Sequence, residues 1–181
     1  MNPLSQYLSK QLKNIKPPFQ WKITIDPQKQ MLELLMHLRI KNEAGVYLQD
    51  ASGTTSDEAY FHIEEKICFY NKDSQLSDPE NYLWAYAIDL NRGVEEGLVD
   101  ALIKQLKIQM NELTVELHQF VNRAEAETFI PYWNETNLEH TLQTLKATGR
   151  YSTERLMIDF KTEKHTLESL KGEKDDSVER I

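Results

Sequence analysis

The sequence predicts an α+β fold in which an antiparallel sheet of about four to five strands packs against one long helix. Several short runs alternate apolar and polar residues, and one later run repeats apolar residues every three or four positions. No segment of the chain repeats another. Strands grouped early in a chain and followed by helices that cover one sheet face are typical of the α+β class.

Alternation is clearest in the first predicted strand, where Phe19, Trp21 and Ile23 share one face. A turn of Asp-Pro-Gln-Lys-Gln separates this strand from the next, so the two predict an antiparallel hairpin. A later strand carries Tyr82 and Trp84, with the small residue Ala85 on its other side. The clearest predicted strands cover residues 19–25, 31–41, 60–70 and 81–90, and residues 46–48 and 127–133 are candidates for further short strands.

The long helix is predicted from about Gly93 to Val121, with Asn91 as its N-cap. Its apolar residues form a stripe about 100° wide. We expect this stripe to cover the sheet face that contains Trp21, Leu34 and Tyr86.

Two short helices complete the predicted fold, one near the N-terminus and one near the C-terminus. Residues 3–15 place leucines on one face and are ended by two prolines, and residues 135–147 are ended by Gly149. We expect one α+β domain over residues 1–160. Residues 161–181 are dominated by polar side chains, so we expect a mobile C-terminal tail.

Charge and cysteine content narrow the classes of function. The net charge is −8, and residues 50–98 alone carry three basic and eleven acidic groups. An acidic surface repels phosphate backbones, so we expect no nucleic-acid partner. Cys68 is the single cysteine and is interpreted as a packing residue. No run approaches the ~20 apolar residues of a membrane span and no export signal is visible, so we expect a cytoplasmic protein without a membrane partner.

The motifs of common enzymes are missing from the sequence. There is no phosphate-binding glycine loop, no pair of histidines at zinc-binding spacing and no nucleophile elbow. We therefore predict no catalytic residue, no cofactor and no metal ligand. One acidic loop contains Asp50, Asp57 and Glu58, but it lacks the spacing of a calcium loop and is interpreted as a turn. The alternative is an enzyme of unrecognised type that uses these carboxylates, with or without a divalent cation.

Tyr82, Trp84 and Tyr86 recur at every second position of one predicted strand. Large aromatic residues in such a pattern are most often part of the core. The alternative interpretation is a recognition surface for a partner or peptide, because aromatic residues dominate the energetics of interfaces.

The order of several residues resembles a family of uncharacterised cytosolic proteins from Firmicutes bacteria, known as a domain of unknown function. The resemblance spans roughly residues 4–140 and leaves the polar C-terminal extension outside the pattern. It implies a bacterial, cytosolic protein and supplies no catalytic residues. The residues that carry it are Trp21, Asn42, Asp50 with Gly53, Glu65 with Phe69-Tyr70, Tyr82-Leu83, Gly93-x-Glu95-x-Gly97, and Phe129 with Trp133.

The leading functional hypothesis is a non-enzymatic protein-interaction or regulatory module of the bacterial cytosol. Its partner would be another protein or a second copy of the chain, bound at an open strand edge or on the bare face of the sheet. The alternative enzyme would use the carboxylates near Asp50, Asp57 and Glu58. A third hypothesis is an acidic mimic of nucleic acid that binds a DNA-binding protein.

Overall fold

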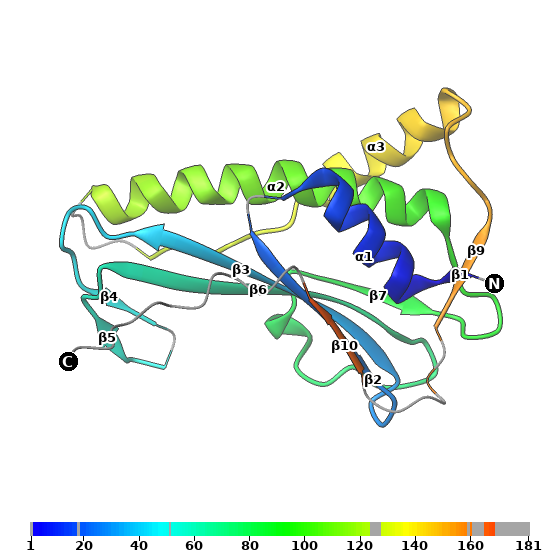
Figure 1. The fold of residues 1–181 in the computed structure, drawn as a ribbon, viewed down its shortest axis with the longest axis horizontal. Coiled ribbons are helices and arrows are strands. Elements are labelled where there is room, and N and C mark those ends of the chain that lie inside the picture. The colour runs from blue at the N-terminus through cyan, green and yellow to red at the C-terminus, as the bar shows by residue number, and fades with distance from the viewer. Residues whose placement is uncertain are drawn as a thin grey trace, which may run out of the picture.

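The computed structural model of the chain describes residues 2–17, 19–50, 52–123, 128–158, 160 and 165–168. In this part of the chain a twisted five-stranded sheet carries α1 and α2 on one face, and α3 packs against α2 (Figure 1). The α+β class predicted from the sequence is confirmed. The elements are β1 (Asn2–Pro3), α1 (Leu4–Ile15), β2 (Gln20–Asp26), β3 (Met31–Lys41), β4 (Leu48–Gln49), β5 (Thr55–Ser56), β6 (Tyr60–Asn71), the 3-10 helix η1 (Pro79–Asn81), β7 (Trp84–Ile88), β8 (Val94–Glu95), α2 (Glu96–Asn122), α3 (Glu135–Ala147), β9 (Arg155–Met157) and β10 (His165–Glu168).

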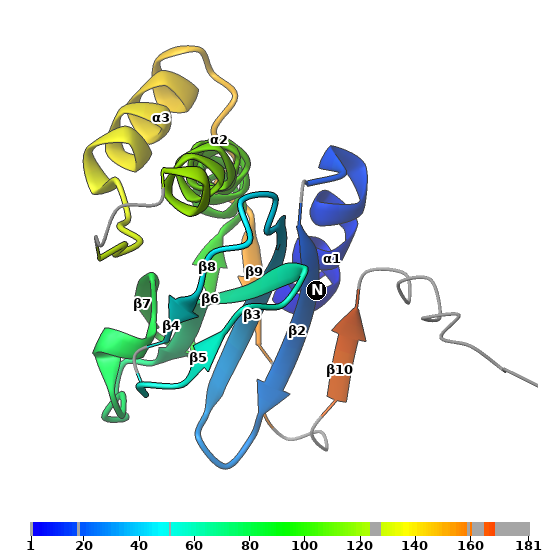
Figure 2. The same ribbon diagram turned by 90° about the vertical axis from the view of Figure 1, so that its left-hand side faces the viewer.

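The strands of the main sheet lie in the order β10-β2-β3-β6-β7, with β10 and β7 at the two edges (Figure 2). β2 and β3 form the predicted hairpin, in which Ile23 lies opposite Leu34. β3 pairs antiparallel with β6 over its whole length, and β10 pairs antiparallel with β2. β7 runs parallel to β6, so the prediction of an entirely antiparallel sheet is wrong at this pair. The connection 72–83, which contains η1, is long enough to return the chain to the same end of the sheet.

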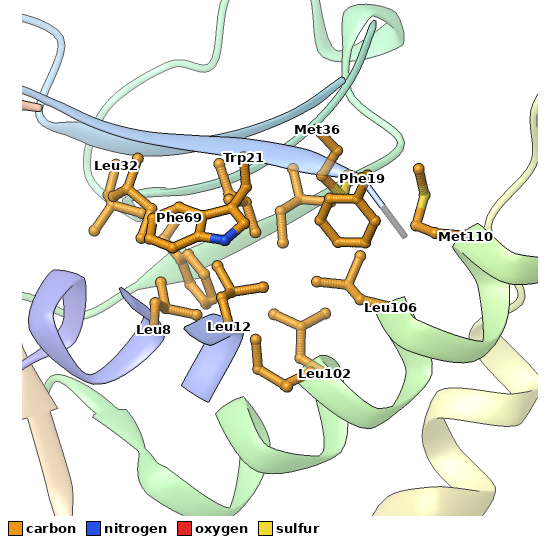
Figure 3. Packing of buried hydrophobic residues seen from close by; sticks show 14 of the residues in the cluster. Leu8, Leu12, Phe19, Trp21, Leu32, Met36, Phe69, Leu102, Leu106 and Met110 are labelled. Carbon is orange, nitrogen blue, oxygen red and sulfur yellow. The ribbon is translucent and has the colours of Figure 1, made fainter. Parts of the chain in front are cut away.

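The core lies between the sheet and the two helices α1 and α2. Figure 3 shows Leu8 and Leu12 of α1, together with Leu102 and Leu106 of α2, pointing toward the aromatic residues of the sheet. Trp21 is 4% exposed. Full burial of one such apolar side chain stabilises the fold by about 1.5–3 kcal/mol. The apolar residues that alternate with polar ones along the predicted strands therefore lie on the sheet face that the helices cover.

The first helix matches the predicted range closely. Leu4, Leu8 and Leu12 are fully buried because four-residue spacing puts them on one face. Lys16 ends the helix in the left-handed region at φ 45°, and its N–H donates to the carbonyl of Leu12. Pro17 follows and cannot continue the helix.

The long helix begins later than the sequence predicts. Val94 and Glu95 form β8, which pairs with β9 in a small sheet that also contains β1. Gly93 has φ +65° and packs directly against the backbone of Leu156, where no side chain fits. The N-cap position is Glu95, so the prediction of Asn91 as the cap is wrong. The pairing of β8 with a distant strand decides the start of α2, and local pattern does not show it.

α3 occupies the predicted residues. The N–H of Asn137 donates to Oδ1 of Asn134 at 3.0 Å, which caps the helix, and Gly149 follows its end with φ 66°. The predicted strand before this helix is wrong, because residues 128–133 form no strand. Residue 127 lies outside the described residues.

β4 and β5 form a small hairpin in the region predicted as a short strand and a polar loop. Within the predicted tail, residues 165–168 form β10, and residues 161–164 and 169–181 lie outside the described residues. The mobility predicted for that tail stays a prediction. Among the described residues, no helix combines the length and apolar content that a membrane span requires.

Candidate functional site

β7 lies at the edge of the main sheet and pairs there with β6. Its sequence, Trp-Ala-Tyr-Ala-Ile, contains no charged residue and no proline. In the described part of the chain no strand pairs with the other side of β7. Edge strands are usually protected by charges, prolines or bulges, because unpaired backbone groups accept another strand. β7 lacks the first two of these protections.

The register shows which backbone groups of β7 are free. The carbonyl of Ile88 accepts a hydrogen bond from the N–H of Lys72 at 2.9 Å, so the Ile88 peptide group faces β6. The register between β6 and β7 is continuous from Trp84 to Ile88, so the direction of the backbone groups alternates over these residues, and the N–H and C=O groups of Trp84 and Tyr86 also face β6. The N–H and C=O groups of Ala85 and Ala87 therefore point away from the sheet. The alternation is interrupted just before β7, where the N–H of Leu83 also donates to the carbonyl of Lys66 at 2.7 Å.

The three aromatic residues predicted to share one strand face lie on two faces. Trp84 and Tyr86 lie beside Ile67 and Phe69 on the helix-covered side. Tyr82 precedes β7, and its hydroxyl donates to Oε1 of Glu33 on the opposite side at 2.8 Å. Burial, followed by this hydrogen bond, raises the pKa of Tyr82. The predicted common face is thus wrong for Tyr82.

A cluster of aromatic rings covers the helix-side flank of β7. Trp84 stacks on Tyr86 with ring centroids 5.5 Å apart, and Trp133 lies 6.0 Å from Trp84. All three side chains are half-buried. Two neighbours of Trp133 in the segment 128–134 are exposed, Ile130 at 76% and Tyr132 at 53%. The edge strand is therefore bordered by partly accessible apolar surface.

The sheet face opposite the helices carries polar and aromatic side chains. Nε2 of His37 and Nδ1 of His62 lie 2.8 Å apart on adjacent strands, within hydrogen-bond distance. The guanidinium of Arg39 stacks over the ring of Tyr60 at 3.7 Å from its centroid. Among the described residues, no group of three or more histidine, cysteine, aspartate or glutamate side chains is arranged to hold a metal ion.

The carboxylates of the acidic loop have separate surroundings. Oδ1 of Asp50 accepts hydrogen bonds from the hydroxyl and N–H of Ser52 and from the N–H of Thr54, which closes the β4–β5 turn. The Ser52 hydroxyl, followed by the Thr54 N–H, lowers the pKa of Asp50. Asp57 and Glu58 follow β5 and are exposed. The geometry gives Asp50 a turn-forming role and joins it to neither of the other two carboxylates.

Cys68 is fully buried in β6. Burial, with a smaller contribution from the nearby Glu33 carboxylate, raises the pKa of its thiol to about 12. A thiol with so high a pKa is protonated at neutral pH and is a poor nucleophile. The interpretation of Cys68 as a packing residue agrees with this environment.

The start of α2 is held by tyrosine–carboxylate hydrogen bonds. The Tyr7 hydroxyl lies 2.7 Å from Oδ1 of Asp100 and 3.0 Å from Oε1 of Glu96. The Tyr151 hydroxyl donates to Glu95, which also forms an ion pair of 2.8 Å with Arg155. These acidic side chains therefore fix α1 and the chain after α3 to the first turn of α2.

The sequence does not show that Trp133 belongs to the aromatic cluster, because Trp133 lies 49 positions from Trp84 along the chain. Its place in an apolar segment between two helices indicated burial only. The free edge of β7 was also not assigned, since the sequence does not show which strand lies outermost.

One comparison with known proteins identifies the family of this chain, and a second finds a protein of similar fold. Residues 1–158 match the family described as "Protein of unknown function (DUF3013)". A solved structure described as a conserved protein of unknown function from Enterococcus faecalis, a Firmicute, matches with a TM-score of 0.72 and 22% identity over 82% of this chain and 90% of that chain. At this identity the likeness concerns the fold alone. No curated protein matches the chain. The match covers most of the sequence, so this chain belongs to the DUF3013 family, as the resemblance to uncharacterised Firmicutes proteins implied.

Proposed function

We propose that this chain is a non-enzymatic protein-interaction module of the bacterial cytosol, and that it adds an extended segment of a partner protein to the free edge of β7. The observation that carries the proposal is an uncharged edge strand whose outer side pairs with no described strand. Strand addition draws affinity from main-chain hydrogen bonds and specificity from pockets for alternate side chains.

The chemistry of the partner segment follows from the two flanks of β7. On the helix side, Trp84, Tyr86 and Trp133 offer half-buried rings, which favour large apolar residues at alternate positions of the partner. On the other side, Ala85 and Ala87 leave space for residues of any size. The segment is therefore expected to alternate apolar with polar residues.

A second copy of the chain is the other occupant that β7 admits. Two β7 strands paired antiparallel around Tyr86 would place Trp84 opposite Ile88 and Ala85 opposite Ala87. No like charges would meet in that arrangement. The test must therefore separate self-association from binding of a different protein.

Other features support the absence of catalysis and a cytosolic location. Cys68 is a free, buried cysteine, which suits a reducing compartment. The described acidic side chains at Asp50 and Glu95 are occupied by local hydrogen bonds and an ion pair. Within the described residues, Asp50 forms its hydrogen bonds inside the β4–β5 turn, while Asp57 and Glu58 are exposed after β5.

The experiment compares three forms of the full chain: wild type, Ala87→Lys and Ala44→Lys. Ala87 is exposed on the edge strand, where a lysine opposes the approach of a further strand. Ala44 is exposed in the turn after β3, so Ala44→Lys adds the same charge away from the edge. Each tagged form is incubated with cytosolic extract, and bound proteins are identified. Light scattering of each purified form reports dimerisation.

We expect wild type and Ala44→Lys to bind the same proteins and Ala87→Lys to lose them, with equal thermal stability of all three forms. A dimer abolished by Ala87→Lys alone would identify the second copy as the occupant. If Ala87→Lys retained every interaction of the wild type, binding at the β7 edge would be wrong.

A further inference from the structure

A groove of about 430 Å³ lies between α2 and α3, away from the β7 edge. Its floor contains Gln105, which is 1% exposed, and Leu145, which is 4% exposed. Its sides include Lys104 and Ile108 from α2 and His140 from α3. Small-molecule sites commonly have volumes of roughly 300–1,000 Å³, so the groove has the size of a ligand site.

The groove is lined by basic groups, although the chain as a whole carries a net charge of −8. Lys104, His140 and Arg150 line it, and no carboxylate does. The acidic residues of α3, Glu135 and Glu139, fall on the opposite face of the helix at 3.6 residues per turn. Within the described ranges, the side chains of Lys104, His140 and Arg150 form no hydrogen bond or ion pair. Their donors are available to a ligand.

Hydrogen bonds to the last carbonyls of α3 weaken the repulsion that the end of this helix exerts on an anion in the groove. The carbonyl of Leu145 accepts the N–H groups of Arg150 and Tyr151 at 2.9 and 3.1 Å, and that of Lys146 accepts the N–H of Gly149. Capped carbonyls present less negative charge to a neighbouring anion. The hydroxyl of Thr148 donates to the carbonyl of Thr144, so it satisfies a further acceptor.

α3 runs antiparallel to α2, which orders the lining residues along the groove. The N–H of Asn134, before α3, donates to Gln109, while Tyr151, after α3, packs on Gly97. Arg150 therefore lies toward the Lys104 end, and the half-exposed Ile108 lies about one helical turn farther along α2. The Lys104 end of the groove is cationic, and the other end combines the apolar Ile108 with polar side chains of α3, among them His140.

We propose that this groove binds a phosphomonoester that has an aromatic or apolar body. The phosphate lies between Lys104 and Arg150, since a guanidinium fork and an ammonium are the side chains that bind phosphate oxygens. The body lies over Ile108 and beside His140. This site uses none of the residues assigned to strand addition, so a negative result for one proposal does not contradict the other.

The test is a titration of the isotope-labelled full chain followed by amide NMR at constant ionic strength. The probes are adenosine monophosphate, inorganic phosphate and adenosine. The variants are Lys104→Gln and Arg150→Gln, with Lys107→Gln as the matched control, because Lys107 is exposed on α2 but does not line the groove. Thermal melts in chloride buffer establish that each variant is folded.

We expect adenosine monophosphate to give saturable shifts at amides of the facing sides of α2 and α3, inorganic phosphate to bind more weakly at the Lys104 end, and adenosine not to saturate. Lys104→Gln and Arg150→Gln should each raise the dissociation constant about tenfold, and Lys107→Gln should leave it unchanged. Absence of saturable shifts, equal binding of adenosine, or equal weakening by Lys107→Gln would each overturn the proposal.

Discussion

The ring of Tyr151 occupies the space that a side chain at position 97 would need. A Cβ atom on Gly97 would lie 2.5 Å from Cδ2 of that ring. The two residues are also joined through the backbone next to Tyr151, because the N–H of Gly97 donates to the carbonyl of Ser152 at 2.9 Å. The glycine therefore lets the chain after α3 lie against the first turn of α2.

Gly97→Ala is expected to destabilise the fold by about 1–3 kcal/mol, because the new methyl group displaces the Tyr151 ring. In an open helix the same change stabilises by about 0.5–1 kcal/mol. Urea unfolding measures the difference. In a Tyr151→Ala background the space is open, so Gly97→Ala should there be neutral or stabilising. Destabilisation of equal size in both backgrounds would show that Tyr151 is not the cause.

Tyr7→Phe is expected to lower the free energy of unfolding at neutral pH, because the hydroxyl donates its one proton to a pair of carboxylates, Asp100 at 2.7 Å and Glu96 at 3.0 Å. Burial, followed by the bond to Asp100, raises the pKa of Tyr7 above its usual value near 10. A raised pKa stabilises the fold below the unfolded pKa, and this contribution is lost as the pH rises past about 10. Denaturant unfolding at several pH values measures the difference in the free energy of unfolding between wild type and Tyr7→Phe. This difference should become smaller above about pH 10. Tyr47→Phe, at an exposed site, is the control for removal of a tyrosine hydroxyl.

Cys68 is expected to resist thiol reagents in the folded protein. The side chain is fully buried and its pKa is raised to about 12, so both access and thiolate formation are suppressed. Labelling followed by mass spectrometry at neutral pH should give slow modification in buffer and rapid modification in concentrated urea. Fast labelling of the folded chain would mean that β6 opens readily.

Phe69→Ala is expected to lower the free energy of unfolding by about 3–5 kcal/mol. The ring is fully buried and contacts the ring of Trp84 at a centroid distance of 5.8 Å. Tyr47→Ala, at a residue that is 71% exposed, should change stability by less than about 0.5 kcal/mol. Denaturant unfolding compares the two variants. A small effect at Phe69 would contradict a core that is closed by α1 and α2.

Much of the fold follows from local pattern. The spacing of Leu4, Leu8 and Leu12 predicted α1, and alternation at Trp21 and Ile23 predicted the β2–β3 hairpin. These features could be found because a residue's face is set by its own element's periodicity.

The remaining features depend on contacts between distant residues. β8 exists because Val94 pairs with Leu156, and this pairing moves the start of α2 to Glu96. The parallel direction of β7 depends on the path of residues 72–83, which no strand pattern records. The aromatic residues of the candidate site could be recognised from the sequence. The placement of Tyr82 on the opposite face and the free edge at Ala85 and Ala87 could not, because both depend on contacts between distant strands.

The central claim is that a partner strand pairs with the outer side of β7, and amide hydrogen exchange of the captured complex tests it most directly. The N–H groups of Ala85 and Ala87 point away from β6, so they should exchange rapidly in the free protein and slowly in the complex. The N–H of Tyr86 faces β6 and should be protected in both states. Unchanged exchange at Ala85 and Ala87, with protection appearing on another surface, would contradict strand addition at this edge.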